Sequence, residues 1–289
     1  MTDQSIVIFG FGYTAICLAK KLATLNVKIM GTSRDSSKHG HYHEAGFELV
    51  DFTETAIVPH IQSATHILIT APPSAAGDPV LANFAAILAA RGSQIGWLGY
   101  LSSTGVYGDH QGRWVDESSA SIGLSQQSQL RLQAENAWTA FAMAHRLPLH
   151  IFRIAGIYGP KRNALTRLAA GKQETVYKEG HFFSRIHVED IASTLLASMN
   201  NPLAGAIYNI ADDEPAPSEQ IDEYASRLLN IPAPKRVPFA LADLSPMAND
   251  FYTHNRRVSN KKIKQELLVT LKFPTYREGL THLLQSEEY

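Results

Sequence analysis

The hydrophobic positions near the amino terminus predict a strand, a glycine turn and a helix in quick succession. Residues 5–9 are almost all apolar, residues 10–15 read GFGYTA, and residues 16–22 carry apolar side chains at helical spacing. A short apolar run bounded by a turn is typical of a buried strand, whereas spacings of three and four residues are typical of an amphipathic helix. The first two dozen residues therefore predict a βα unit.

Apolar runs continue to alternate with helical stretches as far as residue 210. Such alternation predicts an α/β fold, a doubly wound Rossmann-type parallel sheet that binds ligands at the carboxyl ends of its strands. The predicted strands are 5–9, 27–34, 47–52, 66–70, 94–101, 150–154 and 206–210, and the longer predicted helices are 79–91, 125–145 and 190–199.

The regular alternation weakens after Pro160. Residues 161–181 are basic and irregular, and Pro232, Pro234 and Pro238 break up the later helical stretches. Proline cannot continue a helix, so these residues mark loops. We expect two domains, which are a dinucleotide-binding Rossmann domain and a smaller, partly interleaved substrate-binding domain. The expected limits are 1–160 with 183–213 returning to it for the first, and 161–182 with 214–289 for the second.

The composition of the chain limits the classes of partner and the compartment that we expect for it. The chain has 289 residues and a net charge of −1, which gives no electrostatic footprint for nucleic acid or an anionic membrane surface. The lone cysteine, Cys17, excludes an internal disulfide and fits a reducing compartment. No apolar stretch is long enough to span a bilayer, so we expect a cytoplasmic protein. His39, His41 and His43 alternate in a predicted loop and do not predict a metal site.

The glycine turn has the features that a dinucleotide requires. Gly10 permits the tight turn, Gly12 lets the backbone approach a pyrophosphate, and the small Ala15 lets the helix pack against the strand. Tyr13 and Thr14 then open the helix, whose free N–H groups and partial positive charge favour phosphate. We therefore predict a dinucleotide site here.

The end of the second predicted strand indicates which dinucleotide binds. Ser33 and Arg34 stand where an NAD-binding protein usually has an acid for the ribose 2′-hydroxyl. A hydroxyl and a guanidinium suit a 2′-phosphate better, and Lys38 adds charge, so the pattern favours NADP over NAD. A shift of one residue would instead make Asp35 the ribose acid, which would favour NAD. The next two strand ends complete the predicted cofactor site with Asp51, Phe52, Ala71 and Pro72.

Four further strings allow a family to be recognised. In order along the chain they resemble the extended short-chain dehydrogenases, the NAD-dependent epimerases and dehydratases that act on nucleotide sugars. The resemblance covers nearly the whole chain and implies a nicotinamide cofactor, a nucleotide-sugar substrate and a homodimer formed through a four-helix bundle. The strings are LSSTGVYG (101–108), FRIAGIYGP (152–160), RIHVEDIA (185–192) and RRVSNKK (256–262).

Two features depart from this family. The glycines are spaced as GxGxxA, whereas the extended family usually has GxxGxxG. The family also carries a Tyr-xxx-Lys pair, usually followed four residues later by a glutamate. If Glu135 is that glutamate, Gln127 occupies the tyrosine position and Arg131 the lysine position. Gln127 has no proton to exchange, whereas Arg131 keeps the charge and the donors for a nicotinamide ribose.

The resemblance assigns roles to further residues. Ser103 matches the serine that hydrogen-bonds the substrate oxygen, and it would polarise a carbonyl. Tyr107 and His110 are the nearest groups that could replace the missing tyrosine. Relatives hold a nucleotide diphosphate with arginines in the regions of Arg162 and Arg256, for which a guanidinium fork is suited.

Three functional interpretations remain open. The first is an NADP(H)-dependent epimerase, dehydratase or reductase with an altered proton relay, acting on a nucleotide sugar or a similar anionic substrate. The second is a non-catalytic protein of the same fold that senses NADP(H) and signals to a partner. A third is an inactive subunit that pairs with an active relative.

Overall fold

The computed structural model describes residues 4–35, 37 and 47–289, and these form two compact units. Lys38 and the histidines of the predicted loop, His39, His41 and His43, lie outside the described residues. The predicted domains had different limits, because residues 104–125 and the residues after Arg153 pack with the C-terminal part of the chain. Unit 1 comprises Met1–Ser103, Gln126–Arg153 and Ile191–Tyr208, and unit 2 comprises Thr104–Ser125, Ile154–Asp190 and Asn209–Tyr289.

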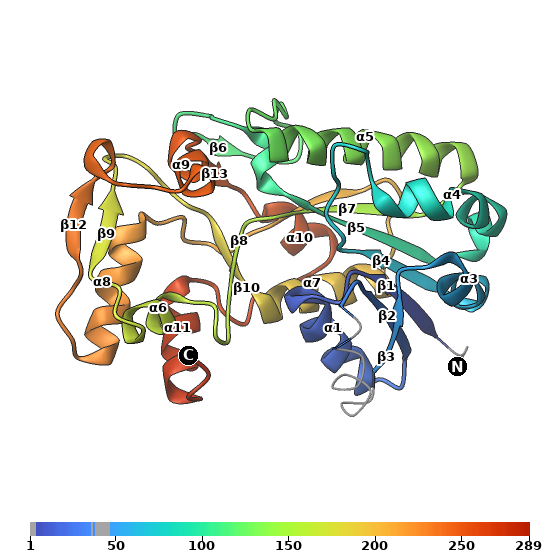
Figure 1. Ribbon diagram of the computed structural model, residues 1–289, viewed down its shortest axis with the longest axis horizontal. Helices are drawn as coiled ribbons and strands as arrows, with labels where there is room; N and C mark the ends of the chain where they lie inside the picture. The colour runs from blue at the N-terminus through green and yellow to red at the C-terminus, as the bar shows by residue number, and fades with distance from the viewer. Residues whose placement is uncertain (1–3, 36, 38–46) are drawn as a thin grey trace. The chain divides into compact units, whose positions relative to one another are not determined.

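A seven-stranded sheet organises unit 1, in the order β11-β7-β5-β4-β1-β2-β3 (Figure 1). The five strands from β3 to β5 pair in parallel, with Val7 of β1 opposite Met30 of β2 and Ile67 of β4. This is the strand order of a doubly wound Rossmann sheet, and it confirms the predicted fold class. The strands are β1 (Ser5–Phe9), β2 (Lys28–Ser33), β3 (Glu48–Asp51), β4 (His66–Ile69), β5 (Trp97–Ser103), β7 (Leu149–Ile154) and β11 (Ile207–Ile210).

Helices cover this sheet. One of them, α3, was not predicted from the sequence, because Pro59 lies inside it and its apolar positions are few; it nevertheless buries Ile57 and Ile61 against the sheet. The Asp78 carboxylate caps α4 by accepting hydrogen bonds from the N–H groups of Val80 and Leu81. The helices are α1 (Tyr13–Ala23), α3 (Glu54–Ser63), α4 (Pro79–Arg91), the short 3-10 helix η1 (Gly92–Gln94), α5 (Gln126–His145) and α7 (Val188–Asn200).

The two faces of the sheet have different cores. Leu98 and Tyr100 face α4 and α5, together with Phe84 and Trp138. Trp97 points to the opposite face, because side chains alternate along a strand. There its ring stacks on His150 at 5.9 Å, and its indole N–H donates to Ser198 of α7 at 3.0 Å. Both faces are therefore sealed, as a parallel sheet requires.

Unit 2 is built from small pieces around its own core. Three two-stranded parallel sheets, β10-β8, β12-β9 and β13-β6, accompany short helices. Tyr158, Leu165, Ile221, Tyr276 and Leu283 belong to one continuous buried cluster. The elements are η2 (Thr104–Tyr107), β6 (Trp114–Val115), β8 (Gly156–Tyr158), α6 (Ala164–Ala169), β9 (Glu174–Tyr177), β10 (Arg185–His187), α8 (Ser218–Leu229), β12 (Lys235–Pro238), η3 (Phe239–Leu241), α9 (Pro246–Thr253), β13 (Arg257–Val258), α10 (Lys261–Glu266) and α11 (Tyr276–Gln285).

Candidate functional site

The glycine loop between β1 and α1 is tied to both neighbouring strands. The N–H of Gly10 donates to the Thr32 hydroxyl at 3.0 Å, and the N–H of Phe11 donates to the Thr32 carbonyl at 2.8 Å. The Thr70 hydroxyl donates to the Gly10 carbonyl from the other side. Gly10 has a φ of +91°, and a Cβ there would lie 2.8 Å from the Thr70 hydroxyl oxygen. Only glycine fits this turn.

Gly12 has the opposite environment. It precedes α1 in an extended conformation, no side chain caps the helix, and a Cβ at Gly12 would meet nothing within 4 Å. The first N–H groups of a helix have no acceptor within the helix, so the start of α1 offers donors next to this open space. An anion is stabilised in such a place by the N–H groups and by the helix dipole. The loop therefore fits the pyrophosphate of a dinucleotide.

Phe11 fixes the loop against β2 in a way that the sequence did not reveal. Its buried ring lies on Gly31, where a Cβ would come within 2.3 Å of the ring, and it packs against Phe47 at a centroid distance of 5.7 Å. Gly31 therefore makes room for Phe11. The signal, a glycine in the middle of a predicted strand, was present in the sequence.

The end of β2 carries the residues that were predicted to select the cofactor. Arg34 is exposed. Asp35 closes a local turn: its N–H donates to the Ser33 hydroxyl at 3.1 Å, and its carboxylate accepts from the N–H and the hydroxyl of Ser37 at 3.2 and 2.5 Å. The Asp35 carboxylate is thus engaged with its own turn.

The remaining predicted cofactor residues follow β3 and β4. Asp51 is exposed at the end of β3, and Phe52 packs edge-on against Phe84 at 5.4 Å. The N–H of Ala71 donates to the Phe9 carbonyl at 3.0 Å, which holds the half-buried Ala71 beside the glycine loop, and Pro72 is exposed. All of these residues lie in unit 1, at the carboxyl ends of its strands.

The first turns of α5 lie beside the end of β5. Gln127 is exposed, and Arg131, one helical turn later, donates from Nη1 to the Leu101 carbonyl at 2.7 Å. Ser103 ends β5 two residues beyond this carbonyl and is half-buried. Tyr100 lies beneath Arg131, and its burial raises the pKa of its phenol to about 12, an effect that Arg131 opposes. This phenol stays protonated at neutral pH.

A buried ionic cluster anchors α5 to the sheet. The Glu135 carboxylate accepts from the Ser102 hydroxyl at 2.5 Å and forms an ion pair with Arg153 of β7 at 2.7 Å. The glutamate and the arginine are each almost fully buried. The cluster joins β5, α5 and β7, so it holds the first half of α5 against the sheet.

Unit 2 holds the other predicted catalytic candidates. Tyr107 is fully buried, and its hydroxyl donates to the Asn209 side-chain oxygen at 2.7 Å. A ring nitrogen of the half-buried His110 lies 3.1 Å from the Tyr107 carbonyl oxygen. Arg256 donates from Nη1 to the Gly108 carbonyl at 2.9 Å, and burial lowers the pKa of its guanidinium to about 10. Arg256 therefore stays charged at neutral pH while it braces this loop.

Arg162 lies instead on a pocket of unit 2 with a volume of about 260 Å³. Arg167, which the sequence places in the same basic segment as Arg162, also lines it. Arg185 and Tyr276 line it too, and sequence reasoning did not bring these two together with Arg162. Nearby, His187 packs on Tyr158 and Phe273, and burial lowers the pKa of its imidazole to about 4, so it is a neutral core residue.

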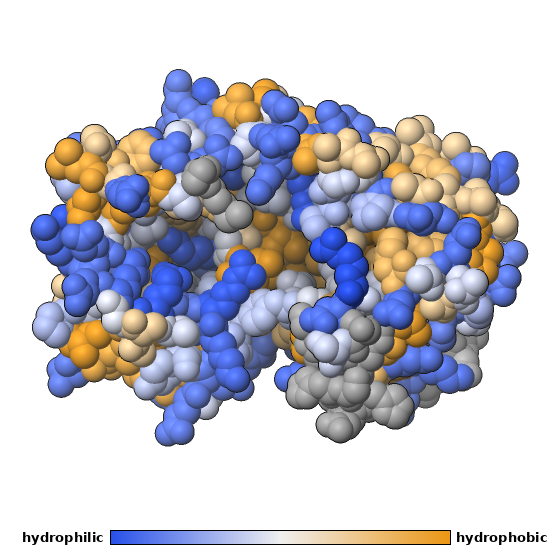
Figure 2. All heavy atoms as spheres, in the orientation of Figure 1, coloured by the Kyte–Doolittle hydropathy of each residue, from blue (hydrophilic) through white to orange (hydrophobic). Residues whose placement is uncertain are grey.

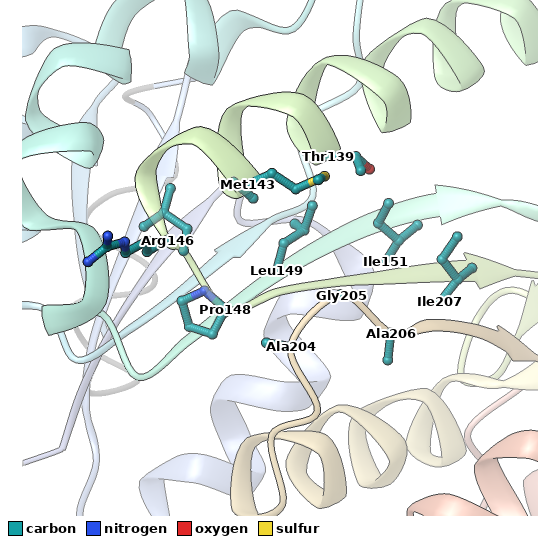
Figure 3. A pocket seen from close by; sticks show the side chains of 12 residues that line it. Thr139, Met143, Arg146, Pro148, Leu149, Ile151, Ala204, Gly205, Ala206 and Ile207 are labelled. Carbon is teal, nitrogen blue, oxygen red and sulfur yellow. The ribbon is translucent and has the colours of Figure 1, made fainter.

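A larger pocket of about 390 Å³ occurs in unit 1, between the C-terminal half of α5 and the edge of the sheet (Figure 3). Its walls include Met143, Leu149, Ala206 and Ile207, and they are mostly apolar. Leu149 begins β7 and Ala206 precedes β11, so the pocket lies at the amino ends of these strands. Dinucleotides bind at the carboxyl ends, so this pocket is not the predicted cofactor site.

Among the residues that the structure describes, no helix has both the length and the apolar character to cross a membrane. Within the same residues, no group of three or more His, Cys, Asp or Glu side chains is placed to hold a metal ion.

Known proteins share this arrangement. A functionally unknown conserved protein from Silicibacter pomeroyi DSS has a solved structure that covers 99% of this chain and 100% of its own, with 44% identity and a TM-score of 0.92. UDP-glucuronic acid 4-epimerase from Bacillus cereus, solved in complex with NAD, covers 99% and 100% with a TM-score of 0.78. Its identity is only 15%, so that likeness concerns the fold.

Curated relatives match over a shorter span. Protein YeeZ from Escherichia coli K12 is 33% identical over 140 residues, 47% of each chain. A 3-diazoavenalumate denitrifying reductase from a Streptomyces species is 29% identical over 140 residues, 45% of each chain. The chain thus spans about half the length of the curated relatives it matches.

The family assignment rests on a longer match. The NAD dependent epimerase/dehydratase family matches residues 6–211, which include the glycine loop, Ser103 and the start of α5. This match and the geometry of the loop together support a nicotinamide dinucleotide as the cofactor. The resemblance predicted from the sequence is confirmed: this chain belongs to the NAD dependent epimerase/dehydratase family.

Proposed function

We propose that this chain is an NADP(H)-dependent oxidoreductase that reduces a small anionic substrate, a nucleotide sugar or a similar compound, with an altered proton relay. The observation that carries the proposal is the pair on α5: Arg131 keeps a cation beside β5, whereas Gln127 offers no titratable proton. Binding of the cofactor is retained in this arrangement, and the usual tyrosine proton transfer is not.

Each cofactor residue has a distinct task in this proposal. The N–H groups of Tyr13 and Thr14 bind the pyrophosphate beside Gly12. Ser33 and Arg34 bind the 2′-phosphate, since Asp35 is engaged in its own turn. Arg131 donates a hydrogen bond from Nη1 to the Leu101 carbonyl and has further N–H donors for the nicotinamide ribose. When bound, the nicotinamide supplies the hydride.

The second group of cofactor residues shapes the walls of the site. Asp51, Phe52, Ala71 and Pro72 follow β3 and β4, on the side of the sheet edge where the adenosine half of a dinucleotide lies. Arg162 and Arg256 are proposed to hold the anionic part of the substrate. Arg162 is exposed and lines a pocket, whereas Arg256 acts through the loop that it braces.

Reduction needs no proton acceptor at this site, whereas epimerisation and dehydration do. Those reactions begin with removal of a proton from a hydroxyl group, and Gln127 cannot accept one. Tyr100 is buried with a pKa of about 12, and the Tyr107 hydroxyl is occupied by Asn209. In a reduction, the Ser103 hydroxyl polarises the acceptor and water supplies the proton. The Streptomyces relative is by name a reductase, which is consistent with this direction.

Calorimetric titration with NADPH and, in parallel, with NADH tests the binding half of the proposal. Tight binding of NADPH and weak binding of NADH are expected. Absorbance of NADPH then reports turnover across a panel of anionic carbonyl compounds and nucleotide sugars. Ser103→Ala should lower that turnover by about a hundredfold, the effect of losing an oxyanion donor. Turnover that is unchanged in Ser103→Ala would remove the polarising role.

A second function is favoured by the same α5 pair and by the buried Tyr107. A chain that binds NADP(H) but has no proton donor can act as a sensor, signalling the redox state to a partner without turnover. In that case NADPH binds and no panel compound oxidises it. The chain then captures a partner to different extents when NADP⁺ and when NADPH is bound.

The homodimer is also a proposal. α4 and α5 are neighbours, and their outer faces expose Ala86, Ala90, Ala140, Ala144 and Met143, the last 79% exposed. Figure 2 shows apolar residues gathered over these two helices. Two such helix pairs would form a four-helix bundle. Light scattering should give the mass of a dimer for the native chain and of a monomer for Ala140→Glu.

A further inference from the structure

We propose that unit 2 contains a subsite for one compact oxyanion, a phosphate or a carboxylate, in the pocket bounded by α6, β10, α8 and α11. Figure 1 shows the three helices next to one another, and the pocket opens among them. The inference deepens the proposed function and rests on it, because the oxyanion would be the charged group of the substrate.

Two cations share one buried carboxylate beside the pocket. Arg167 lies 3.6 Å from the buried Asp222 carboxylate, and Lys172 lies 2.6 Å from the same group. One carboxylate therefore faces two cations. Arg162 adds another guanidinium at the exposed rim. A guanidinium presents a planar fork of donors that matches a carboxylate or a phosphate.

Arg185 also lines the pocket, but both of its Nη groups already donate within the protein, Nη2 to the Ser218 hydroxyl at 3.4 Å. Its Nη1 donates to the carbonyls of Phe183 and Ala216 at 2.9 and 2.8 Å, and its charge is opposed by the buried Asp212. Arg185 therefore shapes the wall, and the binding of an anion falls to Arg162 and Arg167.

Tyr276 supplies an independent observation. Its side chain is 1% exposed and lines the pocket, yet its hydroxyl has no hydrogen-bond partner among the described residues. A buried hydroxyl without a partner has lost its hydrogen bonds to water with nothing in return, which is unfavourable. Because burial raises the pKa of this phenol, it remains a donor at neutral pH. An oxyanion in the pocket would accept this hydrogen bond and remove the cost.

The floor and the size of the pocket restrict the rest of the ligand. Ile157, Ala164, Ile221 and Leu280 form apolar walls. The volume of about 260 Å³ lies below the roughly 300–1,000 Å³ that suits a drug-sized ligand. The pocket therefore accommodates an oxyanion with a small apolar body, and it excludes a whole nucleotide from this subsite.

Titration calorimetry of the full chain without dinucleotide tests this inference, with phenyl phosphate and benzoate as separate probes. Saturable binding of at least one probe is expected. Arg162→Gln and Tyr276→Phe should each weaken it by roughly ten- to a hundredfold, the range for hydrogen bonds to a charged group. Arg236→Gln is the matched control, since Arg236 is an exposed arginine of unit 2 that pairs with Glu223 outside the pocket.

The two probes identify the source of the oxyanion. Binding of phenyl phosphate alone assigns a phosphate, and binding of benzoate alone assigns a carboxylate. Absence of saturable binding to either probe overturns the inference, and so does binding that is equal in Arg162→Gln, Tyr276→Phe and Arg236→Gln.

This result is separable from the proposed function. The dinucleotide residues all belong to unit 1, so NADPH affinity should be native in Tyr276→Phe. A chain that binds the probe but not NADPH would retain the oxyanion subsite and lose the oxidoreductase proposal. A chain that binds NADPH but not the probes would lose the oxyanion subsite and leave the oxidoreductase proposal standing.

Discussion

The glycine loop after β1 and the start of α5 beside β5 serve neighbouring parts of one family's site, yet they are built differently. The loop works through backbone N–H groups and the empty space at Gly12. The α5 region works through side chains: Arg131 on Leu101, and Glu135 between Ser102 and Arg153. On the proposed assignment, the loop keeps what a ligand requires, whereas α5 keeps its anchors and has Gln127 in place of the group that exchanges protons. Binding and chemistry can therefore change separately on one sheet.

The largest expected effect tests whether α5 depends on its anchors. Glu135→Gln leaves the buried Arg153 charge without its partner, and it should lower the free energy of unfolding by about 3–5 kcal/mol. Denaturant unfolding measures this loss. The double variant Glu135→Leu with Arg153→Met should recover most of it, because no buried charge remains. A loss below about 1 kcal/mol in Glu135→Gln would show that the pair is not structural.

The glycine loop should respond in the opposite way. In Gly12→Val the new side chain enters space that no protein atom occupies, so stability should change by at most about 1 kcal/mol, while NADPH affinity falls by at least about a hundredfold. Calorimetry and thermal unfolding separate the two effects. Gly10→Ala is the control: its Cβ meets Thr70 at a positive φ, so it should lose stability as well. Native NADPH affinity in Gly12→Val would contradict the pyrophosphate site.

Acid should weaken the β5–β7 side of the sheet through His150. Burial lowers the pKa of its imidazole to about 4, below the unfolded value of 6.5, so the unfolded chain binds more protons between these values. The contribution of His150 is complete above pH 6.5 and is lost as the pH falls toward 4, amounting to about 2 kcal/mol between pH 8 and pH 5. In His150→Phe the free energy of unfolding should decrease less over this pH range. Unfolding is monitored by Trp97 fluorescence. Equal pH slopes in both proteins would refute this assignment.

Selectivity between the two dinucleotides should change by a smaller factor. Arg34→Ala removes the charged donors proposed for the 2′-phosphate, so NADPH affinity should fall by about thirtyfold. NADH affinity should remain native, because NADH lacks that phosphate. Parallel titrations with both dinucleotides measure the ratio. An equal loss for NADH would indicate that Arg34 supports the loop rather than the phosphate.

The smallest effect is expected at the position where the family has tyrosine. Gln127 is exposed, and Gln127→Ala should change NADPH affinity and any turnover by no more than about twofold. Steady-state kinetics on a substrate found in the panel provides the measurement. A tenfold decrease would show that the amide takes part in the reaction, and the contrast between the loop and α5 would then be weaker than proposed.

The sequence revealed the parts of the fold that local pattern controls. The strands of the sheet and the glycine loop follow from apolar runs and from Gly10, and the structure confirms the Rossmann fold. α3 was not predicted, since Pro59 masks its helical pattern. The turn that engages Asp35 depends on Ser37, a contact that no periodicity signals.

The candidate site was predictable to a lesser degree. Gln127 and Arg131 were found only by aligning Glu135 with a family pattern, and the structure adds that Glu135 is the anchor between Ser102 and Arg153. The oxyanion pocket was not predicted. Arg162 and Arg167 lie in one segment, but Tyr276 comes from a distant one, and only the packing of α6, α8 and α11 brings them together.

The contact between Phe11 and Gly31 makes two segments of the chain mutually dependent in any redesign. A side chain at position 31 would clash with the Phe11 ring, so a second strand with a larger residue there, transplanted from a relative to alter cofactor choice, would displace the loop proposed to bind the cofactor. Such a graft must exchange residues 10–15 together with β2. The two segments are energetically coupled, so a substitution in one of them alone lowers stability, whereas a compensating pair of substitutions is tolerated.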